Sequence, residues 1–110
     1  MQNRHQTKPP TPEALLTRSV RQLLNAAGIF HYKNWGGPMG TPGISDIIGC
    51  YKGRMIAIEL KAPKGTVSPA QKEFIDRINE AGGLAFVART LDEVIDGLEL
   101  QDRFLLRPGP

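Results

Sequence analysis

Two apolar segments separated by the dipeptide Lys52-Gly53 place the strongest limit on what this chain can fold into. The segments ISDIIGCY (residues 44–51) and RMIAIELKA (residues 54–62) are both typical of β-strands, and a Gly in a two-residue connection favours a tight hairpin. That turn fixes which residues of the two strands lie opposite each other. A four-residue loop would keep the same register, whereas a three-residue loop would break it.

The register of this hairpin brings two carboxylates together. Asp46 lies directly opposite Glu59, and residues in that relation have Cβ atoms roughly 4.5–5.5 Å apart. Like charges at this separation repel, so the pair needs a shared proton or, more effectively, a divalent cation. Mg²⁺ prefers carboxylate oxygens and often retains waters, which are potential nucleophiles. Lys61, the next residue on the same strand face, could orient or help to deprotonate such a water, or stabilise charge on a phosphate.

The sequence around this pair allows a simpler interpretation, because an isolated Glu-x-Lys at a strand end is usually a solubilising pair. The opposed Asp46 and the neighbouring loop KNWGGPMGTPG (residues 33–43) favour a reactive site instead. The glycines of this loop could let its backbone approach a nucleic acid, or simply leave it flexible. Trp35 could stack on a base, but packing on the core is the expectation, and Cys50 is expected to be a small buried residue.

The rest of the chain predicts elements that surround the hairpin. Three helices are expected over residues 11–28, 68–83 and 90–98, and two short strands over residues 29–32 and 84–89. The resulting order, αβββαβα, is typical of an α/β fold with a mixed central sheet flanked by helices. We expect a flexible arm over residues 1–10, one domain over residues 11–97 and a C-terminal tail over residues 98–110.

Each of the two longer expected helices carries a polar residue on its inward face. Glu13 is favoured in a first turn by the helix dipole, at roughly 0.3–1 kcal/mol, but it also shares the face of Leu16 and Val20. We therefore expect Glu13 to reach the active edge of the sheet. Gln71 completes a capping box with Ser68 and also lies on the core-facing stripe of its helix, so capping and contact with the site both remain open.

The charge of the chain is unevenly distributed. Its 110 residues have a net charge of +3, yet residues 1–72 contain ten Lys or Arg and three acids, whereas residues 73–110 contain four and eight. A basic face could bind a polyanion such as nucleic acid, although a solvated Lys/Arg surface is a common alternative. The candidates for phosphate contact are Arg18, Arg21, Lys33, Lys52, Lys64 and Lys72, with Arg4, Lys8 and Arg54 as further ones.

Composition excludes several classes of protein. A single cysteine cannot form an internal disulfide, and with only two histidines there is no structural zinc set. No apolar run approaches the roughly 20 residues of a membrane helix, and the N-terminal segment lacks the apolar centre of a signal peptide, so a cytoplasmic location is expected. The sequence also lacks the G-x-x-x-x-G-K-[ST] pattern of a phosphate-binding loop.

Motif order and spacing resemble a known nuclease superfamily. G-x-S-D (Gly43–Asp46) followed thirteen positions later by E-L-K (Glu59–Lys61) resembles the PD-(D/E)XK signature. The flanking helices, with Glu13 and Gln71, resemble the virus-type replication-repair nuclease branch, VRR-NUC, in its short stand-alone form. Ser45 stands where the superfamily name has Pro, a position that varies among such enzymes.

This resemblance implies a restriction-endonuclease-like fold and a metal-dependent DNA endonuclease. The implied ligands of Mg²⁺ or Mn²⁺ are Asp46, Glu59, the Leu60 carbonyl and Glu13, while Lys61 would position the water and Gln71 would assist near the scissile phosphate. Stand-alone members resemble Holliday-junction resolvases, which implies a homodimer acting on branched DNA. The alternatives are a nickase or end-processing nuclease without junction preference, and a non-catalytic DNA-binding module. Apolar tail residues could join a dimer interface or fold back on the core: Phe104, Leu105 and Leu106.

Overall fold

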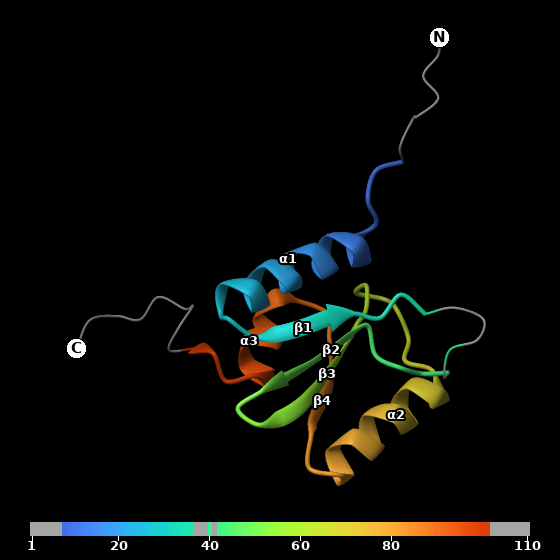
Figure 1. The fold of residues 1–110 in the computed structure, drawn as a ribbon. Helices are drawn as coiled ribbons and strands as arrows, with labels where there is room; N and C mark the ends of the chain where they lie inside the picture. The colour runs from blue at the N-terminus through green and yellow to red at the C-terminus, as the bar shows by residue number, and fades with distance from the viewer. Residues whose placement is uncertain (1–7, 37–39, 41, 102–110) are drawn as a thin grey trace.

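Helices and strands follow one another in the predicted order in the computed structural model, which describes residues 8–36, 40 and 42–101. The elements are α1 (Pro12–Ala26), β1 (Phe30–Lys33), β2 (Ile47–Tyr51), β3 (Arg54–Leu60), α2 (Pro69–Glu80), β4 (Leu84–Ala88) and α3 (Leu91–Gly97) (Figure 1). The main difference from the expected bounds is at β2, which begins after Asp46, so this carboxylate precedes the strand.

The described strands form one mixed sheet in the order β1-β2-β3-β4. The β1–β2 and β2–β3 pairs are antiparallel, and β3 and β4 are parallel with α2 as the crossover between them. Lys52 and Gly53 form the predicted turn, with φ of 54° and 78°, the positive values that suit a tight turn between twisted strands. Tyr51 pairs with Arg54, so the predicted hairpin register is confirmed.

Helices cover both faces of the sheet, α1 and α3 on one face and α2 on the other (Figure 1). The central strand β3 shows how the layers are built. Ile56, Ile58 and Leu60 are fully buried in the core beneath α1 and α3, while Ala57 belongs to the smaller core beneath α2. Since side chains alternate along a strand, Glu59 points to the α2 side of the sheet.

Polar side chains cap the N-terminal ends of the helices, and the predicted capping box of α2 is present. The Thr11 hydroxyl accepts a hydrogen bond from the Ala14 amide at 3.1 Å, and Ser68 and Gln71 form the reciprocal capping box. Thr90 caps α3 in the same manner. None of the helices in the described ranges has the length and apolar character needed to cross a lipid bilayer.

The prediction that Cys50 is buried is wrong, because its side chain is exposed. Cys50 lies in a cross-strand row with Phe30 and Met55, which are 72% and 41% exposed. The core beneath α2 includes Ile48 and Ala57, two pairs further along the hairpin, but not this row. An apolar run in a strand therefore marks burial only where a helix covers that part of the sheet.

Candidate active site

The Asp46 and Glu59 carboxylates meet at one end of the two central strands, where β2 begins and β3 ends. The register that pairs Ile47 with Ile58 continues by one residue to set Asp46 opposite Glu59. The Asp46 Oδ2 atom accepts a hydrogen bond from the Leu60 amide at 2.8 Å, which ties the carboxylate to the end of β3. The opposition predicted from the hairpin is thus present, and it is held by a backbone contact.

Glu59 is the most unusual group of the site, since its side chain is only 3% exposed. Its Oε2 atom accepts a hydrogen bond from Gln71 Nε2 at 3.1 Å and lies 3.4 Å from the Lys61 ammonium. Its Oε1 atom is buried and has no hydrogen-bond partner among the described residues. Burial, and after it the nearby Asp46 carboxylate, raises the pKa of Glu59 to about 7, although Lys61 acts in the opposite direction.

Gln71 performs both of the roles that the sequence left open. Its Oε1 atom accepts a hydrogen bond from the Ser68 amide at 2.9 Å, as the capping box requires, while its Nε2 atom donates to Glu59. One end of the amide is therefore fixed by the cap of α2. The cap aims the other end at the carboxylate, so the start of the helix helps to position the site.

Gly43 lets the loop before β2 pass directly against the first turn of α2. A Cβ atom at this position would lie 2.3 Å from the Ala70 carbonyl oxygen, and the backbone φ is +83°. Ser45, between this glycine and Asp46, is fully buried. The G-x-S-D pattern thus has a packing reason. Only glycine allows the loop to approach α2 closely enough to set Asp46 at the start of β2.

Lys33 is a site residue whose position the sequence did not reveal. It was expected to contact phosphate, but its ammonium lies 3.6 Å from Asp46 Oδ1 and 3.2 Å from the Asn34 carbonyl oxygen. The pairing of β1 with β2, in which Lys33 lies opposite Ile47, brings it there. The connection between these strands is too long for the turn to fix their register, so no local signal in the sequence could predict this contact.

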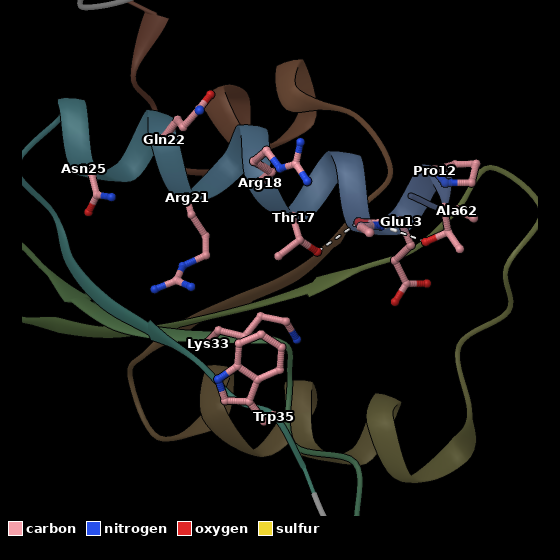
Figure 2. A pocket seen from close by; sticks show the side chains of 12 residues that line it. Pro12, Glu13, Thr17, Arg18, Arg21, Gln22, Asn25, Lys33, Trp35 and Ala62 are labelled. Carbon is pink, nitrogen blue, oxygen red and sulfur yellow. Dashed lines mark hydrogen bonds between the residues drawn. The ribbon is translucent and has the colours of Figure 1, made fainter. Parts of the chain in front are cut away.

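A cleft with a volume of about 780 Å³ lies between α1 and the end of β1, and one of its lining residues, Lys33, contacts Asp46. Figure 2 shows Glu13, Thr17 and Arg21 pointing from α1 toward Lys33 and Trp35 on the other side. Trp35 is 81% exposed, so the expectation that it packs on the core is wrong. It lies two residues after the end of β1, and its ring lines the cleft.

Glu13 was expected to reach the two carboxylates; it lines this cleft but does not join them. Its side chain is exposed in the first turn of α1. Within the part of the chain that the structure describes, no three His, Cys, Asp or Glu side chains lie close enough together to hold a metal ion. The carboxylates that the structure brings together, where β2 begins and β3 ends, are therefore Asp46 and Glu59.

The basic residues predicted to contact phosphate divide into two groups. Arg18, Arg21 and Lys33 line the cleft. Lys52 lies at the far end of the hairpin, with its ammonium 5.3 Å from the centre of the Tyr51 ring. Lys64 is in the loop after β3, and Lys72 lies exposed on α2, 3.5 Å from Asp76. Within the cleft group, Lys33 is the residue that contacts a carboxylate of the site.

Three further basic candidates differ in how the structure places them. Arg54 donates hydrogen bonds to the Gly82 and Gly83 carbonyl oxygens at 3.2 and 2.9 Å, which joins the hairpin to the turn after α2. This contact gives Arg54 a structural role. Lys8 is exposed at the beginning of the described chain, and Arg4 lies outside the described residues.

Asp46, Glu59 and Lys61 gather at one end of the central strands of a mixed sheet flanked by helices. This arrangement defines a nuclease-type domain of restriction-endonuclease-like fold. Residues 10–91 match the family model described as the VRR-NUC domain. Because the match spans most of the chain, the protein belongs to the VRR-NUC family. No curated protein and no solved structure matches the chain. Membership of this family implies a nuclease-type function with DNA as the substrate.

Proposed function

We propose that the protein is a divalent-metal-dependent endonuclease that hydrolyses DNA phosphodiester bonds at the site formed by Asp46 and Glu59. The observation that carries this proposal is the Oε1 atom of Glu59, which is buried beside a second carboxylate and has no hydrogen-bond partner among the described residues. A hard cation satisfies such an oxygen and offsets the repulsion between two carboxylates. The donor set therefore fits Mg²⁺ or Mn²⁺.

The residues that would hold the cation are Asp46, Glu59 and the backbone carbonyl of Leu60. When bound, a divalent ion supplies a water of lowered pKa and a Lewis acid for a phosphoryl oxygen. The chain itself supplies the positioning. The Leu60 amide holds Asp46 at 2.8 Å, and the Gln71 amide holds Glu59 at 3.1 Å. Glu13 is proposed to act from the cleft side, on the substrate strand or through a water.

Lys61 is proposed to orient the attacking water and to stabilise negative charge on the scissile phosphate. Its ammonium lies 3.4 Å from Glu59 and is 14% exposed, so it is partly shielded from solvent. A cation shielded in this way interacts more strongly with developing negative charge than one in bulk water. Lys33, on the other carboxylate, is proposed to assist in binding the phosphate on the cleft side.

We propose further that the enzyme is a homodimer that prefers branched DNA, with four-way junctions as the favoured substrate. A domain of this size has little surface with which to recognise a long sequence. A twofold dimer would place two cleavage sites on opposed strands of a branch. The tail residues considered for the dimer interface lie outside the described residues, whereas the exposed row of Phe30, Cys50 and Met55 offers an apolar surface for such contact.

A cleavage panel tests this function. Four-way junction, flap, nicked and linear duplex DNA are incubated with the wild-type protein and with Glu59→Ala, in Mg²⁺, in Mn²⁺ and in EDTA. We expect symmetric paired cuts in the junction with either metal, none in EDTA, and cleavage by Glu59→Ala reduced at least a hundredfold while DNA binding remains. Equal cutting of every substrate would exclude the junction preference. Binding without any cutting by the wild-type protein would favour a non-catalytic DNA-binding module.

A further inference from the structure

Trp35 is more exposed than any other large apolar side chain among the described residues, at 81%. The Lys33 ammonium lies 5.0 Å from the centre of its ring, a distance at which a cation is attracted to the face of an indole. This contact occupies one side of the ring and leaves most of the indole surface in contact with solvent. A large apolar surface held at the mouth of a cleft is suited to bind a flat, apolar ligand.

The wall of the cleft opposite Trp35 carries groups that suit a nucleotide. Figure 2 shows that α1 presents Thr17 and Arg21 on this wall, and Asn25 lines it further along the helix. The Arg21 Nε atom donates to His31 Nε2 at 3.4 Å. This bond uses one guanidinium N–H, and the terminal nitrogens have no hydrogen-bond partner among the described residues. They remain able to donate to a phosphate in the bidentate geometry that arginine favours.

The cleft is connected to the carboxylates by Lys33. The same ammonium that lies over the Trp35 ring is 3.6 Å from Asp46 Oδ1. A strand that places a phosphate at Asp46 would therefore have its adjacent nucleotide at the cleft. The volume of about 780 Å³ lies within the range of about 300–1,000 Å³ typical of ligand pockets, and it accommodates a nucleotide.

We propose that this cleft binds an unpaired nucleotide of the substrate strand, with its base stacked on Trp35 and its phosphate bound by Arg21 and Lys33. The proposal rests on the nuclease function, because it takes the ligand to be the DNA strand that is cut beside it. A base inside a continuous duplex has both faces covered by its neighbours, so an indole at the protein surface cannot stack on it without unstacking the helix. An unpaired base offers a free face to an aromatic side chain.

The proposal narrows the substrate class. DNA that has an unpaired or unstacked nucleotide next to the cut, as in a flap, a fork or an open branch point, fills the cleft without the cost of unstacking a duplex. Continuous duplex DNA leaves the cleft unused. We expect the protein to bind the first class more tightly, and we expect the difference to depend on the aromatic ring at position 35.

Fluorescence gives a direct test, because Trp35 is the single tryptophan of the chain. The full chain is titrated in EDTA, which prevents cleavage, with single-stranded oligothymidylate and with blunt duplex of equal length. We expect the single strand to quench the emission strongly and the duplex to quench it weakly. In parallel, the affinity of each variant for the single strand is measured by fluorescence anisotropy of a labelled oligonucleotide.

Three variants make the test specific to the ring. Trp35→Ala should lose about tenfold in affinity for the single strand, within the range found when stacking aromatics are removed, whereas Trp35→Phe should retain most of it. Tyr32→Ala is the matched control, because Tyr32 is a 52% exposed aromatic of β1 that does not line the cleft. It should bind as the wild-type protein does. Circular dichroism verifies that each variant is folded.

The possible results separate this inference from the nuclease proposal. Equal quenching by single strand and duplex, or wild-type affinity in Trp35→Ala, would overturn the stacking site even in a protein that cuts DNA. Quenching by the single strand that depends on Trp35, in a protein that cuts no DNA with any metal, would support the stacking site and overturn the nuclease proposal.

Discussion

At the scale of single residues, Glu59 is the group whose burial most needs an explanation. A buried acid opposes folding when it is ionised, and burial, followed by the nearby Asp46 carboxylate, raises the pKa of Glu59 from 4.5 to about 7. Asp46, Lys61 and Gln71 all contact or face this one carboxylate. A protein stabilised only by its core would gain from replacing Glu59, so its burial near the end of β3 indicates a functional use.

The titration of Glu59 predicts how stability depends on pH in the metal-free protein. Below pH 4.5 the group is protonated in both states. Between pH 4.5 and about 7 the unfolded chain is ionised while the folded chain retains its proton, so the free energy of unfolding falls as the pH rises through this window. Above it, the difference is constant.

Glu59→Gln removes this titration, and it should therefore be more stable than the wild-type protein at pH 8 in EDTA, by up to about 3 kcal/mol at roughly 1.4 kcal/mol per pKa unit. The difference should become small at pH 5. Urea unfolding at the two pH values measures it. Equal stability of the two proteins at both pH values would contradict the account of Glu59.

At the scale of elements, the contact between the loop before β2 and the first turn of α2 sets the position of Asp46. An alanine at position 43 would bring its Cβ within 2.3 Å of the Ala70 carbonyl oxygen and would require a positive φ. Gly43→Ala should therefore lower the free energy of unfolding by about 1–3 kcal/mol and slow DNA cleavage as Asp46 moves.

Gly28→Ala is the matched control for this prediction. Its backbone φ is +72°, but a Cβ atom there would meet no atom of the described residues within 4 Å. This variant carries the backbone strain without the clash, so it should lose some stability and keep the wild-type cleavage rate. Thermal unfolding and initial rates on one substrate compare the two. Similar rates in Gly43→Ala and the wild-type protein would show that the loop does not position Asp46.

The elements also explain what the sequence could predict. The short Lys52-Gly53 turn fixes the β2–β3 register, so the opposition of Asp46 and Glu59 followed from spacing alone. The β1–β2 connection is long and fixes no register, so the contact of Lys33 with Asp46 could not be predicted. Hydrophobic pattern shows which strands exist but not where a helix stops covering them.

The side chains misjudged from the sequence share that cause. Cys50 lies in a part of the sheet that the core beneath α2 does not include, and Trp35 lies beyond the end of β1. In both cases the residue type favours burial, but the extent of the covering layer decides the exposure. The two open roles of Gln71 could not be separated because one amide performs both.

At the scale of the whole molecule, the apolar row of Phe30, Cys50 and Met55 is the surface most suited to join two copies of the chain. These residues lie side by side across three strands and are exposed. Met55→Glu would bury a charge in such an interface, so it should convert a dimer into a monomer, as measured by light scattering after gel filtration. Leu15→Glu should leave the dimer intact, because Leu15 is a 46% exposed residue of α1 that lies outside this row. A wild-type protein that is monomeric at micromolar concentration would contradict the dimer.

The central claim, that Asp46 and Glu59 act together on a divalent cation, is tested most directly by the cleavage rate of one labelled DNA substrate as a function of Mg²⁺ concentration. The wild-type rate should rise to a plateau with Mg²⁺ and vanish in EDTA. Asp46→Asn, which keeps the shape of the side chain, should be at least a hundredfold slower at every concentration while still binding DNA. Asp76→Asn, which removes an exposed carboxylate from α2, should follow the wild-type curve. Wild-type cleavage by Asp46→Asn, or a wild-type rate that does not depend on Mg²⁺, would contradict the account.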